Sequence, residues 1–138
     1  MKQPGPDHPI KITDNPHRIR VVLGGFIVAE TTRSLTLKEA QYPPVHYIPR
    51  EDVHMDLLDR TEHRSHCPYK GDADQYWDVV GRPDVRGIAW SYSAPFPAVS
   101  RIQDRVAFYD ELVDLTVDGV PQPRPHSVFS SAANRPTS

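Results

Sequence analysis

Residues 18–29 read RIRVVLGGFIVA, two short apolar runs on either side of Gly24 and Gly25. Two glycines between β-type runs are typical of a hairpin, because the tight turns that join antiparallel strands need residues with positive φ. Further along, residues 87–92 read GIAWSY and alternate large apolar side chains with small ones. This period of two indicates another strand. The chain is therefore expected to form a sheet around the hairpin.

Similar short runs recur through the middle of the chain, and turn residues separate them. Further strands are predicted at 34–37, 45–48, 75–80, 105–109 and 112–117. Residues 50–58 and 97–102 suit one or two helical turns each, and 63–68 read as a loop. Because no helical pattern exceeds three turns, the sequence predicts an all-β, mostly antiparallel domain and not a βαβ fold.

Proline marks the predicted limits of the domain. The chain has 15 prolines in 138 residues, and more than half of them lie within 1–16 and 119–138. Both ends also lack apolar periodicity, so they cannot bury enough surface to offset the entropy of ordering. We therefore expect disordered tails at 1–16 and 119–138 around a single folded domain at 17–118.

The charge pattern disfavours several partners. The net charge is −2, with 16 basic and 18 acidic residues interspersed, whereas a nucleic-acid binder usually carries a basic face. No apolar stretch is long enough to span a bilayer, and the N-terminus has no apolar signal region. A single cysteine excludes an intramolecular disulfide and is typical of a cytoplasmic protein. A small molecule is the expected partner, and the sequence leaves the oligomeric state open.

Polar and aromatic side chains gather in four stretches, 47–53, 67–71, 89–92 and 106–109. Tyrosine, tryptophan, arginine and lysine together suit a site that stacks a flat ligand and holds an anionic group. In small β domains, however, the same aromatic residues usually pack the core, and surface arginines usually pair with acids.

These stretches also carry a resemblance to a known family. The matching words are YIPREDV (47–53), HCPYKG (66–71), YW (76–77), AWSY (89–92) and VAFY (106–109). In this order they resemble the bacterial family named domain of unknown function 427, which also carries an old nucleotidyltransferase label. The resemblance covers about 18–109. It implies a β-tent fold similar to Mss4-like proteins, in which two small curved sheets enclose a groove. Many β-tent relatives bind zinc through two Cys-x-x-Cys pairs, which a chain with only Cys67 cannot form.

The leading functional expectation is that this groove binds an anionic or aromatic small molecule, with no cofactor. The expected ligand-binding residues are Tyr47, Arg50, Cys67, Tyr76, Trp90 and Tyr92. The alternative is a cofactor-free acid/base enzyme, such as an isomerase or cyclase, that uses Lys70, Asp52 and Tyr69. Burial would lower the lysine pKa toward the working range, and a carboxylate neighbour would oppose that shift. Lys70 and Asp52 could equally form a structural ion pair at the groove edge.

Three other functions stay as weaker alternatives. His63, His66 and Cys67 offer metal-ligand chemistry, but their spacing matches no standard site, so no metal is predicted. Nucleotide transfer would need carboxylates for Mg²⁺ and a phosphate-binding loop. Asp72 and Asp74 have suitable spacing, but the glycine pair lies in a hairpin. The proline-rich tails could also bind a protein partner.

Overall fold

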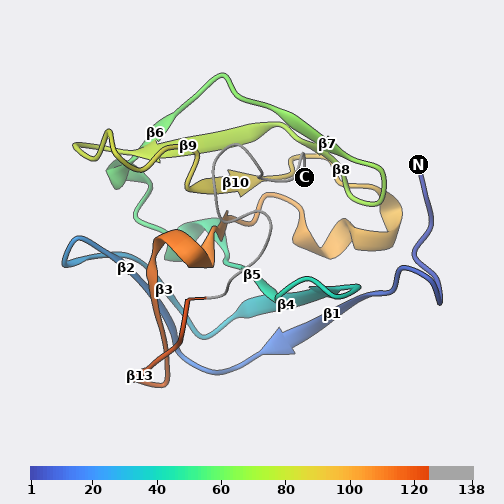
Figure 1. Ribbon diagram of the computed structural model, residues 1–138, viewed down its shortest axis with the longest axis horizontal. Coiled ribbons are helices and arrows are strands. Elements are labelled where there is room, and N and C mark those ends of the chain that lie inside the picture. The colour runs from blue at the N-terminus through green and yellow to red at the C-terminus, as the bar shows by residue number, and fades with distance from the viewer. Residues whose placement is uncertain (125–138) are drawn as a thin grey trace.

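The computed structural model describes residues 1–124 and is built almost entirely from short antiparallel strands (Figure 1). The strands are β1 (Ile10–Asn15), β2 (Ile19–Leu23), β3 (Phe26–Thr31), β4 (Ser34–Glu39), β5 (Val45–Tyr47), β6 (Leu58–Arg60), β7 (Ser65–Cys67), β8 (Gly71–Ala73), β9 (Gln75–Val79), β10 (Ala89–Ser91), β11 (Ala107–Phe108), β12 (Asp114–Val117) and β13 (Val120–Pro121). Four short 3₁₀ helices connect them: η1 (Arg50–Asp52), η2 (Met55–Leu57), η3 (Pro97–Ile102) and η4 (Asp110–Leu112). The all-β prediction is confirmed.

The strands form several small open sheets instead of one large one. Their strand orders are β1-β4-β5, β11-β10-β9-β6, β13-β12-β2-β3 and the pair β7-β8. In Figure 1 the sheet that contains β6 and β9 lies on one side of the molecule, and β1, β4 and the β2–β3 hairpin lie on the other. The apolar side chains of these sheets face inward and form two buried clusters.

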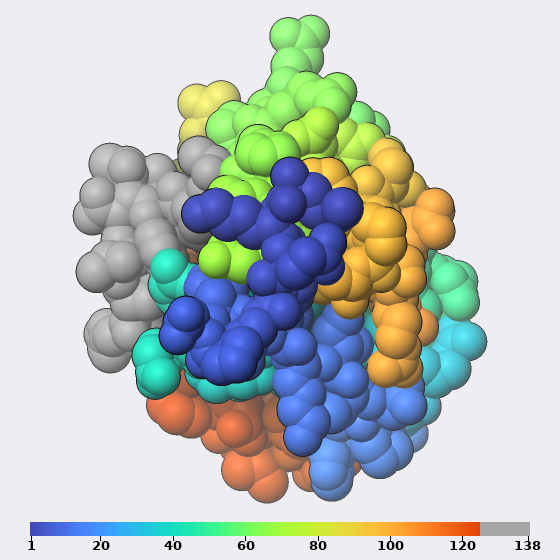
Figure 2. All heavy atoms as spheres, turned by 90° about the vertical axis from the view of Figure 1, so that its right-hand side faces the viewer, coloured from blue at the N-terminus to red at the C-terminus, as the bar shows by residue number. Residues whose placement is uncertain are grey.

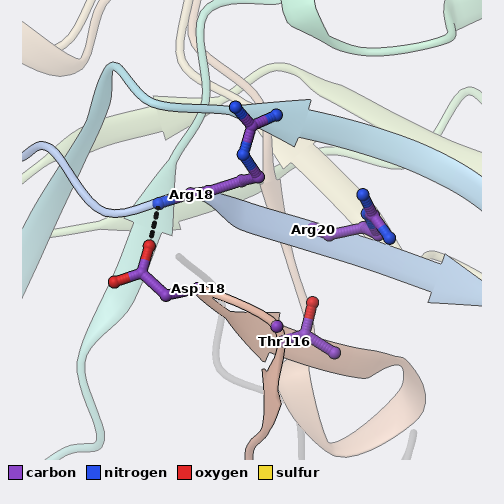
Figure 3. A pocket seen from close by; sticks show the side chains of 5 residues that line it. Arg18, Arg20, Thr116 and Asp118 are labelled. Carbon is purple, nitrogen blue, oxygen red and sulfur yellow. Dashed lines mark hydrogen bonds between the residues drawn. The ribbon is translucent and has the colours of Figure 1, made fainter.

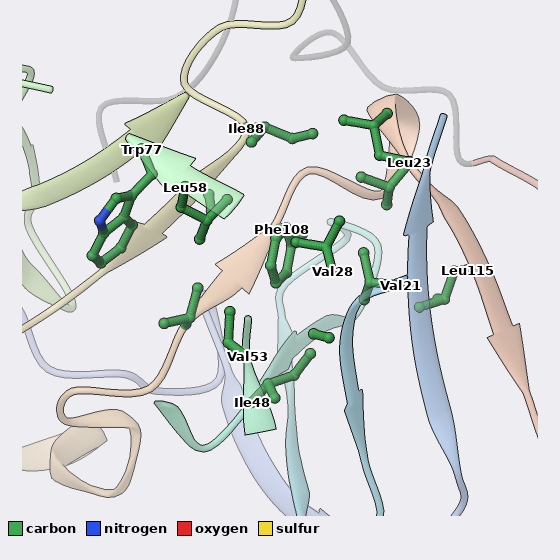
Figure 4. Packing of buried hydrophobic residues seen from close by; sticks show 14 of the residues in the cluster. Val21, Leu23, Val28, Ile48, Val53, Leu58, Trp77, Ile88, Phe108 and Leu115 are labelled. Carbon is green, nitrogen blue, oxygen red and sulfur yellow. The ribbon is translucent and has the colours of Figure 1, made fainter. Parts of the chain in front are cut away.

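The β2–β3 hairpin forms where the sequence predicts it. Gly24 and Gly25 have φ values of 57° and 83°, the left-handed region that a two-residue turn of this type requires. Val21 and Leu23 point into the first apolar cluster together with Val28 of β3. Figure 4 shows this cluster, in which the hairpin packs toward Phe108 and, further away, Trp77. The hairpin is thereby held against the β9–β10 sheet.

The second cluster is richer in aromatic residues. It contains Leu35, Leu37, Tyr47, Ala73, Tyr76, Trp90, Tyr92, Val99, Ile102, Ala107 and Tyr109. The two clusters lie on opposite faces of β9 and β10, because side chains alternate along a strand. Trp77 and Ala89 are partners in the sheet and belong to the first cluster, whereas their neighbours Tyr76 and Trp90 pair with each other and belong to the second.

The structure corrects the predicted tails in part. Residues 10–15 form β1, which pairs with β4 along its whole length, so the prediction of a tail over 1–16 is wrong for this stretch. Ile10 and Ile12 pack against the second cluster, an alternation that the flanking prolines at 9 and 16 obscured. Part of the predicted C-terminal tail forms β13, and its last residues, 125–138, lie outside the described part of the chain. The predicted loop at 63–68 contains β7.

Candidate functional site

A buried lysine lies between β7 and β8. These strands form a tight hairpin in which Cys67 pairs with Gly71, and the loop that joins them turns Lys70 inward. Gly71 has a φ of 106° and packs against Phe96, a conformation that favours glycine. Lys70 is only 6% exposed, and its Nζ donates a hydrogen bond of 2.6 Å to Oε1 of Glu39, on β4. The site therefore contains a charged pair closed off from solvent.

The electrostatics keep this pair ionised. Burial by itself disfavours the ammonium of Lys70, but the hydroxyl of Tyr47 and the carboxylate of Glu39 favour it, and the pKa of Lys70 lies above its usual value. Burial likewise disfavours the Glu39 carboxylate, but Lys70 and then His8 lower its pKa below the usual value. At neutral pH Lys70 is therefore a cation and a hydrogen-bond donor. Burial does not turn it into a base, because the neighbouring Tyr47, Glu39 and Cys67 together outweigh the burial effect on its pKa.

Three polar groups beside this pair are buried without a hydrogen-bond partner among the described residues. They are the hydroxyls of Tyr47 and Tyr92 and the indole Nε1 of Trp90. The rings of Tyr47 and Trp90 meet edge to face, with centroids 6.5 Å apart. Burial raises the pKa of both tyrosines, so their hydroxyls stay protonated at neutral pH. At Tyr47 the charge of Lys70 and then the Trp90 N–H oppose this shift: the indole lies near the hydroxyl, but the two do not meet in hydrogen-bond geometry. Each buried polar group left without a partner costs about 1–3 kcal/mol.

The cysteine and a further tyrosine lie at the same place. Cys67 is buried, and its thiol is close enough to Lys70 and Tyr47 to influence their protonation. Tyr76 also lines the second cluster and bonds to Ser65 through its hydroxyl, with 2.7 Å between the oxygens. We refer to Glu39, Tyr47, Cys67, Lys70, Trp90 and Tyr92 as the Lys70 cluster. Most of the ligand-binding residues expected from the sequence meet in or beside it.

The N-terminal residues cover one side of the Lys70 cluster. Nε2 of His8 lies 2.7 Å from Oε2 of Glu39, opposite the oxygen that accepts from Lys70. The imidazole also stacks on Tyr69, with ring centroids 3.9 Å apart and planes only 8° from parallel. The Lys2 ammonium lies 5.9 Å from the centre of the same ring. Tyr69 therefore faces the N-terminal segment and joins the site from its outer side.

One family model covers most of the chain. It is described as domain of unknown function (DUF427), has the short name NTP_transf_9, and matches residues 11–119. The chain belongs to this family. No curated protein matches the chain. The match to DUF427 begins inside β1 and includes every member of the Lys70 cluster, whereas His8 and the residues before it lie outside the matched span.

Arg50 does not join the Lys70 cluster of this DUF427 chain. Its guanidinium donates to the backbone oxygen of Asp104 at 3.0 Å, and to the side chains of Gln75 at 2.7 Å and Ser91 at 3.1 Å. It also stacks over Trp77, with 5.2 Å to the ring centre. These contacts lie on the face of β9 and β10 opposite Trp90. Arg50 and Lys70 therefore cannot hold the same small ligand in this arrangement.

Asp52 is also separate from the Lys70 cluster. Its carboxylate accepts hydrogen bonds from the Thr31 hydroxyl at 2.8 Å and from Arg33 at 3.3 Å. The expectation that Asp52 lies beside Lys70 is wrong, because Glu39 occupies that position. Glu39 was missed, although a sequence signal exists: it continues the alternation of Leu35 and Leu37, so an acidic residue falls on the apolar face of β4.

The candidate metal ligands do not converge. Neighbouring residues of β7 point to opposite faces, so His66 is exposed and Cys67 is buried. His66 pairs with Asp72 at 2.7 Å, and His63 packs edge to face against Tyr76. Within residues 1–124 no group of three or more histidine, cysteine, aspartate or glutamate side chains is arranged to hold a metal ion.

The nucleotidyltransferase name of the family would require carboxylates that are available to bind Mg²⁺, and Asp72 and Asp74 give it little support. Asp74 accepts hydrogen bonds from the backbone and hydroxyl of Ser93, and these bonds lower the pKa of Asp74 against the effect of burial. Asp72 pairs with His66. Both carboxylates are thus engaged in local structure.

No helix in the described part of the chain is long and apolar enough to span a membrane.

Two surface hollows lie away from the Lys70 cluster. One is lined by Arg18, Arg20, Thr116, Asp118 and Gly119 (Figure 3), and both of its arginines already pair with Glu30. The other is an apolar cleft whose polar members include His46 and Asp110. Burial raises the pKa of Asp110 to about 7, with a smaller contribution from the charge of Glu111. Burial lowers the pKa of His46, so the cleft disfavours charge on both groups.

Proposed function

We propose that the Lys70 cluster binds a small molecule that presents acceptor oxygens to it. The observation that carries the proposal is the set of buried donors without partners among the described residues, the hydroxyls of Tyr47 and Tyr92 and Nε1 of Trp90, beside an ionised lysine. A native fold rarely leaves three such groups together unsatisfied, since each costs free energy. A ligand that accepts from them would recover that cost on binding.

The chemistry of the donors narrows the ligand class. An indole N–H can only donate, and a lysine ammonium has three N–H groups, of which one bonds to Glu39. The Lys70 and Glu39 charges cancel, so the site suits a neutral carbonyl compound or a single carboxylate better than a multiply charged phosphate. The rings of Tyr47, Trp90 and Tyr109 contact one another, and such aromatic surroundings favour a flat, partly apolar ligand.

The direct test is native mass spectrometry of the freshly purified chain. We expect a mass excess of a few hundred daltons, released on denaturation and identified by fragmentation. The matched variant is Trp90→Phe, which keeps an aromatic ring and removes the N–H donor. It should lose most of the excess, while Trp77→Phe, in the first cluster, should keep it. Equal retention by both variants would place the molecule elsewhere.

A second candidate function is cofactor-free acid/base catalysis at the same cluster. It is favoured by the continuous chain of contacts from His8 through the two oxygens of Glu39 to Lys70. In this mechanism the Lys70 ammonium transfers a proton to a carbonyl oxygen and becomes a neutral amine, and the Glu39 carboxylate stabilises the positive charge that the proton carries to the substrate. Lys70→Met separates the two functions. A binder loses part of its affinity, whereas an enzyme loses turnover with any substrate that the retained molecule identifies.

The finer features of fold and location are proposed alongside. Several small antiparallel sheets with buried clusters between them support a β-tent fold in a protein of bacterial origin. A buried free thiol at Cys67 supports a reducing cytoplasm, where such a group stays reduced. An experimental structure compared with Mss4-like proteins tests the first proposal, and fractionation of cells that express the tagged chain tests the second.

A further inference from the structure

The segment of residues 1–9 lies over the Lys70 cluster without belonging to any strand of the four sheets. In Figure 2 these residues, dark blue, lie across the middle of one face of the molecule. A small turn, in which Gly5 and His8 exchange two backbone hydrogen bonds, shapes the segment and directs the His8 side chain toward Glu39. The segment also precedes the span matched by the family model, which begins at residue 11.

Side-chain exposure falls step by step from this segment into the cluster. The His8 side chain is 24% exposed, Glu39 is 11% exposed and Lys70 is 7% exposed. His8 is thus the outermost member of the chain of contacts that ends at the buried ammonium. Whatever reaches Lys70 along this line must first displace His8 from Glu39.

The contacts that hold the segment are few and lie near the surface. Apart from its own turn, its backbone is attached to the rest of the described chain by two hydrogen bonds, from Lys2 to the oxygen of Pro68 and from Ala40 to the oxygen of Pro9. Its side chains add the stack of His8 on Tyr69, the bond of His8 to Glu39, and the Lys2 ammonium near the Tyr69 ring. Segments with little buried apolar surface open at low free energy, well below that of global unfolding. The cluster beneath, by contrast, belongs to the folded core.

We infer that residues 1–9 form a lid over the Lys70 cluster, latched by His8 on Glu39 and Tyr69, and that opening of this lid admits small molecules to the site. The inference deepens the proposed function by naming how small molecules reach the same site. It rests on the proposed function only for the identity of the molecule that enters. Deletion of the latch should leave β1 and both apolar clusters intact, because none of them contains His8.

Cys67 provides a test that needs no knowledge of the ligand. It is the only cysteine in the chain, and it is buried in the cluster. N-ethylmaleimide reports access to it: the sulfur adds to one alkene carbon of the reagent, and the thiol proton is transferred to the other. Intact mass spectrometry follows the addition of one reagent over time. The full chain is compared with His8→Ala, and with His17→Ala as a matched control.

His17 suits this control because it forms a similar pair, with Nδ1 2.7 Å from Oδ2 of Asp118, but on the exposed surface and with no member of the Lys70 cluster. We expect labelling of Cys67 to be about tenfold faster in His8→Ala, which corresponds to about 1.4 kcal/mol of opening free energy. His17→Ala should label at the rate of the unaltered chain. Tyr69→Ala, which removes the other half of the latch, should resemble His8→Ala.

Unchanged labelling in both His8→Ala and Tyr69→Ala, with unaltered melting temperatures, would overturn the lid. Rapid labelling of the unaltered chain would overturn it equally, since the latch would then close nothing. The proposed function is tested separately, by native mass spectrometry. Faster labelling in His8→Ala supports the lid even if native mass spectrometry finds no retained molecule, and a retained molecule in a chain with unchanged labelling supports the site without the lid.

Discussion

Nζ of Lys70 and Oε1 of Glu39 lie 2.6 Å apart inside the protein, on elements separated by 31 positions of sequence. Removing one member of a buried pair leaves the other charge without compensation, which typically costs about 3–5 kcal/mol. We therefore expect Lys70→Met and Glu39→Gln each to lower the free energy of unfolding by about this amount, as measured by urea denaturation.

The double variant Glu39→Gln with Lys70→Met distinguishes a pair from two independent contacts. Because it leaves no buried charge, it should be less destabilised than the sum of the two single variants, by at least ~1 kcal/mol. Strict additivity would show that the two side chains do not interact in solution.

The unpartnered hydroxyl of Tyr47 leads to an unusual expectation for stability. Tyr47→Phe removes a buried donor that has no acceptor among the described residues, so it should leave the ligand-free chain equally stable or more stable. Tyr76→Phe is the matched control, because it removes a hydroxyl bonded to Ser65 and should cost about 1 kcal/mol. Thermal unfolding of both variants, after removal of any retained molecule, measures the difference. A Tyr47→Phe variant as destabilised as Tyr76→Phe would mean that the Tyr47 hydroxyl has a partner.

Arg50 is expected to matter for stability and not for the Lys70 cluster. It ties η1 to β9, β10 and the backbone of Asp104 through three hydrogen bonds and packs over Trp77. Arg50→Ala should therefore lower the free energy of unfolding by about 2–3 kcal/mol, because charged donors contribute roughly 1.5–3 kcal/mol each before partners readjust. Arg33→Ala, which removes exposed pairs with Glu51 and Asp52, should change the melting temperature much less. If Arg50→Ala melts like the unaltered chain, Arg50 is free to serve a ligand after all.

The sequence predicts the strands well because local alternation and turn residues decide them. The glycine pair at 24–25 and the alternating stretch at 87–92 both lead to the strands that form. Strand β1 was not predicted because prolines flank it. It is stabilised by pairing with β4, and this long-range contact cannot be recognised from the local sequence pattern.

The candidate site was predicted less completely, for a similar reason. The sequence motifs shared with the family contain four residues that the fold brings together: Cys67, Lys70, Trp90 and Tyr92. Glu39 and His8 reach the cluster only through tertiary packing. The prediction put Arg50 on the same face of the sheet as Lys70. It was wrong because β9 and β10 separate the two residues, and the position of these strands relative to Arg50 depends on tertiary packing.

Asp110 gives the protein a distinctive dependence of stability on pH. Burial raises its pKa from the ordinary 3.8 to about 7, so the native state holds a proton that the unfolded chain releases near pH 4. The stabilisation from this group is therefore complete below about pH 4 and is lost as the pH rises through 7. A pKa that differs by one between the native and unfolded states corresponds to about 1.4 kcal/mol of stability, and partial exposure reduces the total, so the loss should be about 2–4 kcal/mol.

Asp110→Asn removes this titration while keeping the shape of the side chain. The variant should match the unaltered chain at pH 4 and exceed its stability by a growing margin up to pH 8, in urea denaturation at each pH. Asp7→Asn, at an exposed position in the N-terminal segment, is the control for removing one carboxylate. A constant difference between Asp110→Asn and the unaltered chain across this range would show that Asp110 is already ionised at pH 4. Its cleft would then be open to water in solution, and it would not favour the neutral acid.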